Sequence, residues 1–294
     1  MRRDFLRLAD LTLAEHDTLF KRAVELKADR LARRAHATLA GRTLALIFEK
    51  ASTRTRLSFE AAMLSLGGHV ITLDAQGSQI ARGEPIADTA RVVSRYADAI
   101  MFRTSTDERL NELARAATVP VINGLSEGGH PVQLLADLMT VRERVGELRG
   151  KIIAFVGDGA CNMSRSWIEA AAMFDFELRV AAPEGYRPPV PGRAKIVADP
   201  REAVAGADVI ATDVWTSMGQ EAESAIRLKT LSGYTVDAAL LARAKKDAIV
   251  LHCLPAHRGE EISAEVLEGP QSAVWDEAEN RMHAQKALLE LLLL

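Results

Sequence analysis

Apolar residues along the chain alternate between two kinds of pattern. Short runs rich in Val, Ile, Leu and Ala have the length and composition of buried strands, and between them apolar residues follow the spacing of amphipathic helices, as at 59–66 and 237–245. The strand-like runs are 43–48, 69–73, 99–102, 119–122, 152–156, 178–181, 209–211 and 249–251. Strands that alternate with helices in this way predict parallel sheets joined by crossover helices, the α/β class.

One long helical pattern at 131–145 separates two halves with the same rhythm. A chain of 294 residues is long for a single hydrophobic core, so length favours two domains. We therefore expect two doubly wound parallel-sheet domains, residues 1–135 and 136–278, with the active site in the cleft between them. The segment 279–294 is helical in pattern and ends in a leucine run that must cover an apolar surface, and we expect it to pack back onto the first domain.

Composition narrows the class of partner. Hydrophobic residues make up 48% of the chain, charged residues 26%, and the net charge is −3, values that exclude a disordered tail, a nucleic-acid binder or a polybasic membrane surface. The apolar runs are too short to cross a bilayer, and the N-terminus lacks the apolar stretch of a signal peptide. Cys161 and Cys253 are too few for a disulfide scaffold. We expect a cytoplasmic protein with reduced thiols that acts on small molecules and binds neither nucleic acid nor membrane.

A polar segment follows the first strand-like run and opens a helix. It reads Phe-Glu-Lys-Ala-Ser-Thr-Arg-Thr-Arg over 48–56. Free N–H groups at a helix start, the hydroxyls of Ser52, Thr53 and Thr55 and the guanidinium of Arg54 suit a phosphate. The alternative is that Ser52 or Thr53 merely caps the helix while the arginines are solvated. The Gly-x-x-x-x-Gly-Lys frame of a nucleotide-binding loop is missing.

Here the chain resembles a known family. Ser-Thr-Arg-Thr-Arg at 52–56 is similar to the carbamoyl phosphate signature of the aspartate and ornithine carbamoyltransferases. Phe-Arg-Thr at 102–104 and His-Pro-Val-Gln at 130–133 follow in the order of that family, although a lone histidine is more often structural. The resemblance implies that the phosphate is held by Ser52, Thr53, Arg54, Thr55 and Arg103. It further implies that the carbonyl oxygen is polarised by Arg103, Thr55 and His130, and that Gln133 receives the carbamoyl amide.

A loop after the second strand, 77–84, matches a loop that in this family reaches into the active site of a neighbouring subunit. The residue carried over by the resemblance is Gln79, as a contact to carbamoyl phosphate. The implied assembly is a homotrimer or a multiple of it. The alternative is an ordinary polar loop.

A second segment with candidate binding residues, 213–221, resembles the family's ornithine-specific loop with its Ser-Met-Gly core. A cationic α-amine needs a carboxylate and a hydroxyl, which Asp213 and Ser217 offer. By resemblance, Asn162 and the N–H of Met218 hold the α-carboxylate. The alternative is a plain turn with Met218 in the core. Two departures from the family concern Cys161, which stands where the first of two asparagines is usual, and the short segment 183–198, which leaves little room for the usual helix.

A third candidate motif is His-Cys-Leu-Pro at 252–255. A nucleophilic role for Cys253 is rejected, because direct transfer from a mixed anhydride needs no covalent intermediate and no oriented base is evident. By resemblance, Cys253 contacts the δ-amine, the Leu254 carbonyl holds the carbamoyl nitrogen, and Arg281 returns to the carbamoyl phosphate oxygens. Alternatively Cys253 is a buried apolar residue. With His252 and His257, Cys253 could resemble a set of metal ligands, but no further clustered ligand appears in the sequence, which favours adventitious inhibition by zinc over a zinc requirement.

The resemblance thus implies transfer of a carbamoyl group from carbamoyl phosphate to the δ-amine of L-ornithine, giving L-citrulline and phosphate, without cofactor or metal. The implied catalytic residues are Arg54, Arg103, His130 and Cys253. One alternative is a sister enzyme that acts on putrescine or an N-acylated ornithine. Others are a non-catalytic relative and a nicotinamide-dependent oxidoreductase, since Val-Gly-Asp-Gly at 156–159 follows a strand, although a third glycine and the ribose-binding acid are missing.

Overall fold

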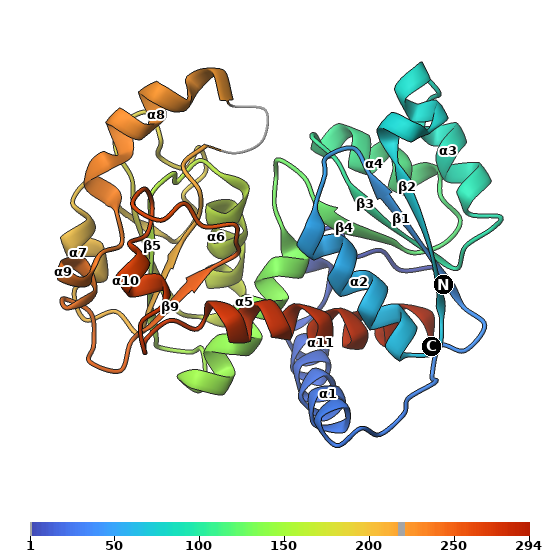
Figure 1. Ribbon diagram of the computed structural model, residues 1–294, viewed down its shortest axis with the longest axis horizontal. Coiled ribbons are helices and arrows are strands. Elements are labelled where there is room, and N and C mark those ends of the chain that lie inside the picture. Colours follow the sequence, from blue (N-terminus) through green and yellow to red (C-terminus); the bar gives the residue numbers. More distant parts are fainter. Residues whose placement is uncertain (1, 217–220) are drawn as a thin grey trace. The chain divides into compact units, whose positions relative to one another are not determined.

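The computed structural model describes residues 2–216 and 221–294 (Figure 1). The chain forms two compact units, Met1–Leu135 with Asn280–Leu294, and Ala136–Glu279. Each unit contains one parallel sheet flanked by helices, so the α/β class expected from the sequence is confirmed. None of the helices in the described ranges is long and apolar enough to cross a membrane.

The first unit has a four-stranded sheet in the order β2-β1-β3-β4. Its strands are β1 (Thr43–Phe48), β2 (His69–Asp74), β3 (Ala99–Arg103) and β4 (Val121–Leu125). Its helices are α1 (Leu13–Leu31), α2 (Thr53–Ser65), α3 (Ile86–Val93), α4 (Asp107–Ala116) and the start of α5 (Pro131–Arg144), with short 3-10 turns at η1 (Leu8–Asp10), η2 (Ala75–Gly77) and η3 (Gln79–Arg82). The last helix, α11 (Val274–Leu293), ends in this unit.

Helices cover both faces of the sheet in this unit. The chain runs from β1 outward to β2 and then reverses direction to β3 and β4, and right-handed crossovers therefore put α2 on one face and α3 and α4 on the other, as Figure 1 shows. Side chains of α3 and α4 pack against Ala45, Ile47, Ile100 and Phe102. Leu288 and Leu289 of α11 are fully buried, whereas Leu291, Leu292 and Leu293 are half-buried and Leu294 is exposed, so only the start of the leucine run covers an apolar surface.

The second unit has a five-stranded sheet in the order β7-β6-β5-β8-β9. Its strands are β5 (Ile152–Val156), β6 (Glu177–Ala181), β7 (Lys195–Val197), β8 (Val209–Thr212) and β9 (Ile249–His252). Its helices are α6 (Asn162–Phe174), α7 (Pro200–Val204), α8 (Ser224–Leu231), α9 (Ala238–Leu241) and α10 (Ala264–Leu267), with 3-10 turns at η4 (Glu221–Glu223) and η5 (Ser232–Tyr234). The core on one face joins side chains of α7, α8, α9 and α10 to Ala154, Ile210 and Val250.

Most elements lie where the apolar pattern predicts them, with three differences. β4 begins at Val121 and not at Val119, and the short strand β7 was not expected. The helix expected at 237–245 ends at Leu241, because the chain then turns and the Lys245 N–H donates to the Ala207 carbonyl (3.0 Å) on the way to β9. No helix occurs between β6 and β7 over the described residues 182–194, which agrees with the shortness of this segment.

Both sheets have a switch point, where the chain reverses direction across the sheet. In the first unit it lies between β1 and β3, and in the second between β5 and β8. Ligands of open parallel sheets bind beyond the carboxyl ends of the strands at such points. Ser52 and Arg103 lie beyond or at these ends in the first unit, and Asn162 and Asp213 lie beyond them in the second.

Candidate functional site

The loop after β1 and the first turn of α2 form the base of the first site. Ser52 is the N-cap of α2, and its hydroxyl accepts a hydrogen bond from the Thr55 N–H (3.3 Å). The capping role considered for Ser52 is therefore present. It leaves further N–H groups of the first turn for a ligand, next to the exposed hydroxyl of Thr53 and the partly buried Arg54.

Two guanidinium groups from different elements converge on the side-chain oxygen of Thr55, a residue that is 1% exposed. Arg281 Nη2 of α11 donates to Thr55 Oγ1 (2.8 Å), and Arg103 Nη1 at the end of β3 lies 3.5 Å from the same atom. Arg281 Nη1 also donates to Gln133 Oε1 on α5. Two buried guanidinium groups thus meet one hydroxyl and one amide, an arrangement that suits an anionic ligand.

His130 precedes α5 and is buried near these cations. Burial, followed by the positive charges of Arg281 and Arg103, holds the pKa of His130 well below its ordinary value. The imidazole is therefore neutral at physiological pH and retains one N–H donor. A neutral donor beside two permanent cations can polarise an oxygen without being titrated itself.

Glu49 fixes the loop that carries Ser52. Its N–H donates to the Arg103 carbonyl (2.9 Å), and its carboxylate accepts from the Thr104 hydroxyl and from Arg109 Nε (2.9 and 3.1 Å). The contacts tie the end of β1 to the end of β3 and to α4. Sequence reasoning missed Glu49, and the signal available was an acidic residue within a basic, hydroxyl-rich run.

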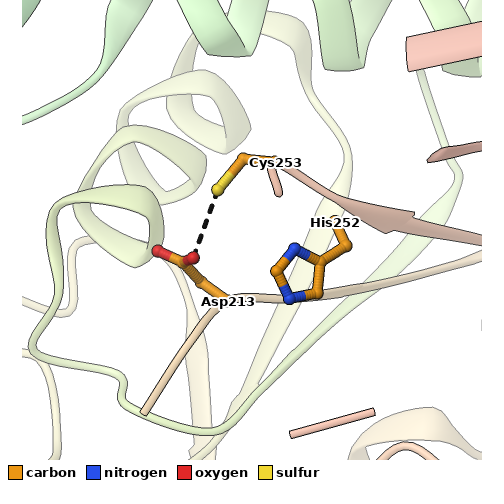
Figure 2. Close-up of side chains that lie close together, drawn as sticks. All are labelled: Asp213, His252 and Cys253. Carbon is orange, nitrogen blue, oxygen red and sulfur yellow. Dashed lines mark hydrogen bonds between the residues drawn. The ribbon is translucent and has the colours of Figure 1, made fainter. Parts of the chain in front are cut away.

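In the second unit, the register of β8 and β9 brings Asp213 and Cys253 together. Thr212 lies opposite His252, so the residues that follow are neighbours. The Cys253 thiol donates to Asp213 Oδ1 (3.2 Å), as Figure 2 shows, and the Val214 N–H donates to the same oxygen (2.8 Å). Asp213 is 8% exposed, and burial raises its pKa.

The electrostatics of Cys253 keep its proton in place. Burial first, and then the negative charges of Asp213 and Glu277, raise the pKa of the thiol well above its ordinary value. A reactive cysteine needs the opposite environment, because the thiolate is the nucleophile. Cys253 is therefore built as a neutral hydrogen-bonding group, which supports the rejection of a nucleophilic role.

His252 holds the loop after β9. Its Nδ1 accepts from the Leu254 N–H (2.9 Å), so the ring proton lies on Nε2, which donates to Glu261 Oε1 (2.9 Å). Glu261 also accepts from the His257 N–H (2.6 Å), and Glu277 Oε2 accepts from the His252 N–H (2.9 Å). These contacts fix Leu254, whose φ is +56°. Glu261 and Glu277 were not singled out from the sequence.

Two groups of side chains have the spacing of metal ligands within the described part of the chain. Ligand atoms of Asp213, His252 and Cys253 lie within 4.8 Å of one another, as do those of His257, Glu260 and Glu261. Both ring nitrogens of His252 are already hydrogen-bonded, however, and Cys253 is held as a thiol. An ion in the first group would displace existing bonds, so these residues do not form a preorganised metal site.

Asn162 begins α6 beyond β5, at the same sheet edge as Asp213. Cys161 is the N-cap of this helix, and its sulfur accepts from the Ser164 N–H (3.5 Å), so it takes the capping position that asparagine commonly fills. Burial raises the pKa of the Cys161 thiol.

Ser217 and Met218 lie outside the described residues. Gln79 begins η3 after β2 and is exposed.

Together, the two units define an α/β protein with a cationic site at one parallel-sheet edge and a carboxylate–thiol site at another, the architecture of a two-substrate enzyme. Two family models match the chain: the carbamoyl-P binding domain of the aspartate/ornithine carbamoyltransferases over residues 3–143, and the Asp/Orn binding domain over 149–292. The chain belongs to the aspartate/ornithine carbamoyltransferase family.

Individual relatives match over nearly the full length. An ornithine carbamoyltransferase of Sorangium cellulosum is 54% identical over 306 residues, covering 99% of this chain and 98% of the relative. The anabolic ornithine carbamoyltransferase of Pseudomonas aeruginosa is 54% identical over 297 residues, with 99% and 97% covered. The solved ornithine carbamoyltransferase of Pyrococcus furiosus superimposes with a TM-score of 0.94 at 48% identity, with 99% and 97% covered.

Proposed function

We propose that this chain transfers the carbamoyl group of carbamoyl phosphate to the δ-amine of L-ornithine, giving L-citrulline and phosphate. The observation that carries the proposal is the pairing of Asp213 with the protonated Cys253 thiol, in a chain whose other unit gathers Arg103 and Arg281 around Thr55. The first pair suits a diamino acid and the second group a phosphorylated substrate. The names of the full-length relatives agree with this choice.

The residues of the first unit bind carbamoyl phosphate in this proposal. The phosphate is held by Ser52, Thr53, Arg54, Thr55 and Arg103, with Arg281 on the same oxygens. The carbonyl oxygen is polarised by Arg103, Thr55 and His130. Gln133 accepts from the carbamoyl amide, which is consistent with the orientation that Arg281 gives its side chain.

The residues of the second unit bind the amino acid. Asp213 and Ser217 receive the α-amine, while Asn162 and the N–H of Met218 receive the α-carboxylate. The Cys253 thiol contacts the δ-amine, and the Leu254 carbonyl accepts from the carbamoyl nitrogen. Support for the last role is the His252 and Glu261 chain that fixes the Leu254 backbone.

The reaction is a direct attack. The neutral δ-nitrogen forms a bond to the carbamoyl carbon, the carbon–oxygen bond to phosphate breaks, and the proton lost by the nitrogen leaves with phosphate or solvent. Cationic groups on the carbonyl oxygen and the phosphate stabilise the charge that develops in the transition state. Holding both reactants in line adds a term on the order of 7 kcal/mol or more.

We also propose a homotrimer in which Gln79 reaches carbamoyl phosphate in a neighbouring subunit. A hollow lined by β2, η3 and α3 exposes Ile71 (45%), Val92 (48%) and Tyr96 (72%) beside this loop. Exposed apolar groups at a sheet edge suit contact with a second copy. Mixing inactive Gln79→Ala subunits with inactive Arg54→Gly subunits should restore activity, because some mixed interfaces combine two intact halves; no gain on mixing would exclude shared sites.

A cytoplasmic location is part of the proposal, and the two cysteines are free thiols. The same active site serves arginine biosynthesis or, in reverse, arginine catabolism.

The test is citrulline formation by the purified protein with carbamoyl phosphate and ornithine, and in parallel with putrescine, N-acetylornithine and aspartate. We expect activity with ornithine alone. Carbamoylation of another amine would retain the first site but replace the proposed substrate. Inactivity with all four would return the chain to the non-catalytic alternative.

A further inference from the structure

One buried guanidinium connects the loops at the carboxyl edge of the second sheet. Arg227 lies on α8, outside the residues assigned above. Its Nη1 donates to Asp158 Oδ2 (2.8 Å) and to the Trp215 carbonyl (3.1 Å), and its Nε donates to Glu223 Oε2 (3.1 Å). The guanidinium carbon also lies 5.1 Å from the centroid of the Tyr186 ring. The Arg227 and Asp158 side chains are only 10% and 8% exposed.

The partners of Arg227 belong to loops that follow three different strands. Asp158 follows β5, Tyr186 follows β6, and Trp215 follows β8. Asp158 in turn fixes the loop after β5, because its Oδ1 accepts a hydrogen bond from the Ala160 N–H (2.9 Å) and its carbonyl oxygen accepts one from the Cys161 N–H (3.3 Å). The loop that Asp158 shapes leads directly to Asn162. These contacts therefore help to position Asn162, the residue proposed to bind the α-carboxylate.

The contact to Trp215 acts on the loop after β8. Trp215 is two residues beyond Asp213 and is 2% exposed. Its indole packs over Gly157, where an added Cβ would lie 3.3 Å from Trp215 Nε1, so this loop also rests on the loop after β5. A single guanidinium thus fixes the spacing between the chain near Asp213 and the chain near Asn162.

A purely stabilising ion pair is a weak explanation for this arrangement. Burial of two charges costs desolvation energy that their attraction often only offsets, so a buried pair is a poor source of stability. A guanidinium offers several donors in a fixed fork, which suits the joining of separate loops.

We propose that Arg227 is a positioning residue that sets the affinity for the amino-acid substrate by holding the Asn162 and Asp213 loops in register, without touching the substrate. This inference rests on the proposed function. It predicts a selective effect on one substrate, since the residues proposed to hold the phosphate belong to the other unit and Leu254 is not among the hydrogen-bond partners of Arg227 given above.

The test is steady-state kinetics with each substrate varied in turn, on Arg227→Met, Arg227→Lys and Asp158→Asn. Loss of charge-assisted hydrogen bonds should raise the KM for ornithine about tenfold or more in Arg227→Met, with the KM for carbamoyl phosphate changed by less than about twofold and kcat reduced less than the ornithine KM rises. Arg227→Lys should recover part of the affinity, because one ammonium reaches fewer acceptors.

Glu223→Gln is the matched control. It removes the charge of a partner whose side chain is 64% exposed, so both KM values should stay near those of the wild type. Binding of L-norvaline, which has the α-groups of ornithine without the δ-amine, to the enzyme saturated with carbamoyl phosphate should weaken in parallel with the rise in KM. This binding assay reads the proposed effect without turnover.

Either an unchanged ornithine KM in Arg227→Met, or an equal rise in both KM values, would overturn the inference. If Arg227→Met does not fold, Arg227→Lys and Asp158→Asn decide the question by the same comparison, the change in the KM for ornithine against the change in the KM for carbamoyl phosphate. If the wild-type protein forms no citrulline, the proposed function is wrong, and so is the inference that rests on it. If the wild type is active and the variants are unaffected, only the inference is wrong.

Discussion

Replacing Glu261 by glutamine tests whether the loop after β9 is held by charge. Glu261 Oε1 accepts from His252 Nε2 (2.9 Å) and from the His257 N–H (2.6 Å), and the His252 and Glu261 side chains are both fully buried. The amide keeps the shape and an acceptor oxygen but turns two charge-assisted bonds into neutral ones. The difference between these kinds of bond gives a loss of about 1–2 kcal/mol, or about 5- to 30-fold in kcat/KM for ornithine.

The effect should fall on kcat, because Leu254 and Cys253 are proposed to contact the reacting groups. The assay is citrulline formation at saturating carbamoyl phosphate with ornithine varied. Glu260→Gln is the control, since it changes the adjacent residue, whose contact with His257 at 3.4 Å lies at the surface. A kcat of Glu261→Gln within about twofold of the wild type, equal to that of Glu260→Gln, would refute the role given to the His252 chain.

Four further predictions concern residues of the site. Arg54→Gly should abolish turnover while the circular dichroism spectrum stays that of the wild type, and an active variant would end the assignment of the anion site. The raised pKa of Cys253 should make alkylation by iodoacetamide at pH 7.5 slower than that of a free thiol, and Asp213→Asn should accelerate it; mass spectrometry of the labelled peptide checks both. Turnover should rise with pH toward about 10, the ordinary pKa of an alkylamine, as the δ-amine loses its proton, and should show no inflection near pH 6.5 from His130, whose pKa is lowered. Stability, read from the midpoint of urea unfolding, should fall below about pH 6.5, because the histidine of the unfolded chain then takes up a proton that the folded chain does not, and this pH dependence should shrink in His130→Asn.

Patterns within a few residues of one another predicted most of the fold. The run 43–48 is β1 residue for residue, and the hydroxyl at Ser52 caps α2 as its position suggested. β4 starts later than expected because Pro120 has no N–H to give to a sheet, although its carbonyl accepts from the Ile100 N–H (2.9 Å). β7 escaped notice because it is a three-residue strand at the sheet edge, after a proline-rich segment, and lacks a long apolar run.

Contacts between distant parts of the chain mark the limit of the sequence analysis. Arg281 lies 226 positions after Thr55, and Arg227 lies 69 positions after Asp158. Family resemblance named Arg281 but gave no reason for its place, whereas the structure shows its bonds to Thr55 and Gln133. Arg227 and Glu261 carry no local pattern at all, since a charged residue on an amphipathic helix or in a loop usually faces solvent. Their burial is a property of the packed fold.

The pairing of Asp213 with Cys253 resolves a conflict that the proposed reaction creates. A carboxylate favours the cationic form of an amine beside it, and a free alkylamine is already mostly cationic at neutral pH. That suits the α-amine of ornithine, which is bound and never reacts, but it opposes attack by the δ-amine, which must be neutral. A thiol kept protonated by burial and by Asp213 carries no charge, so it can orient the δ-nitrogen without raising its pKa. This is a physical reason for a cysteine beside this aspartate, where a second acid would favour the unreactive ammonium form.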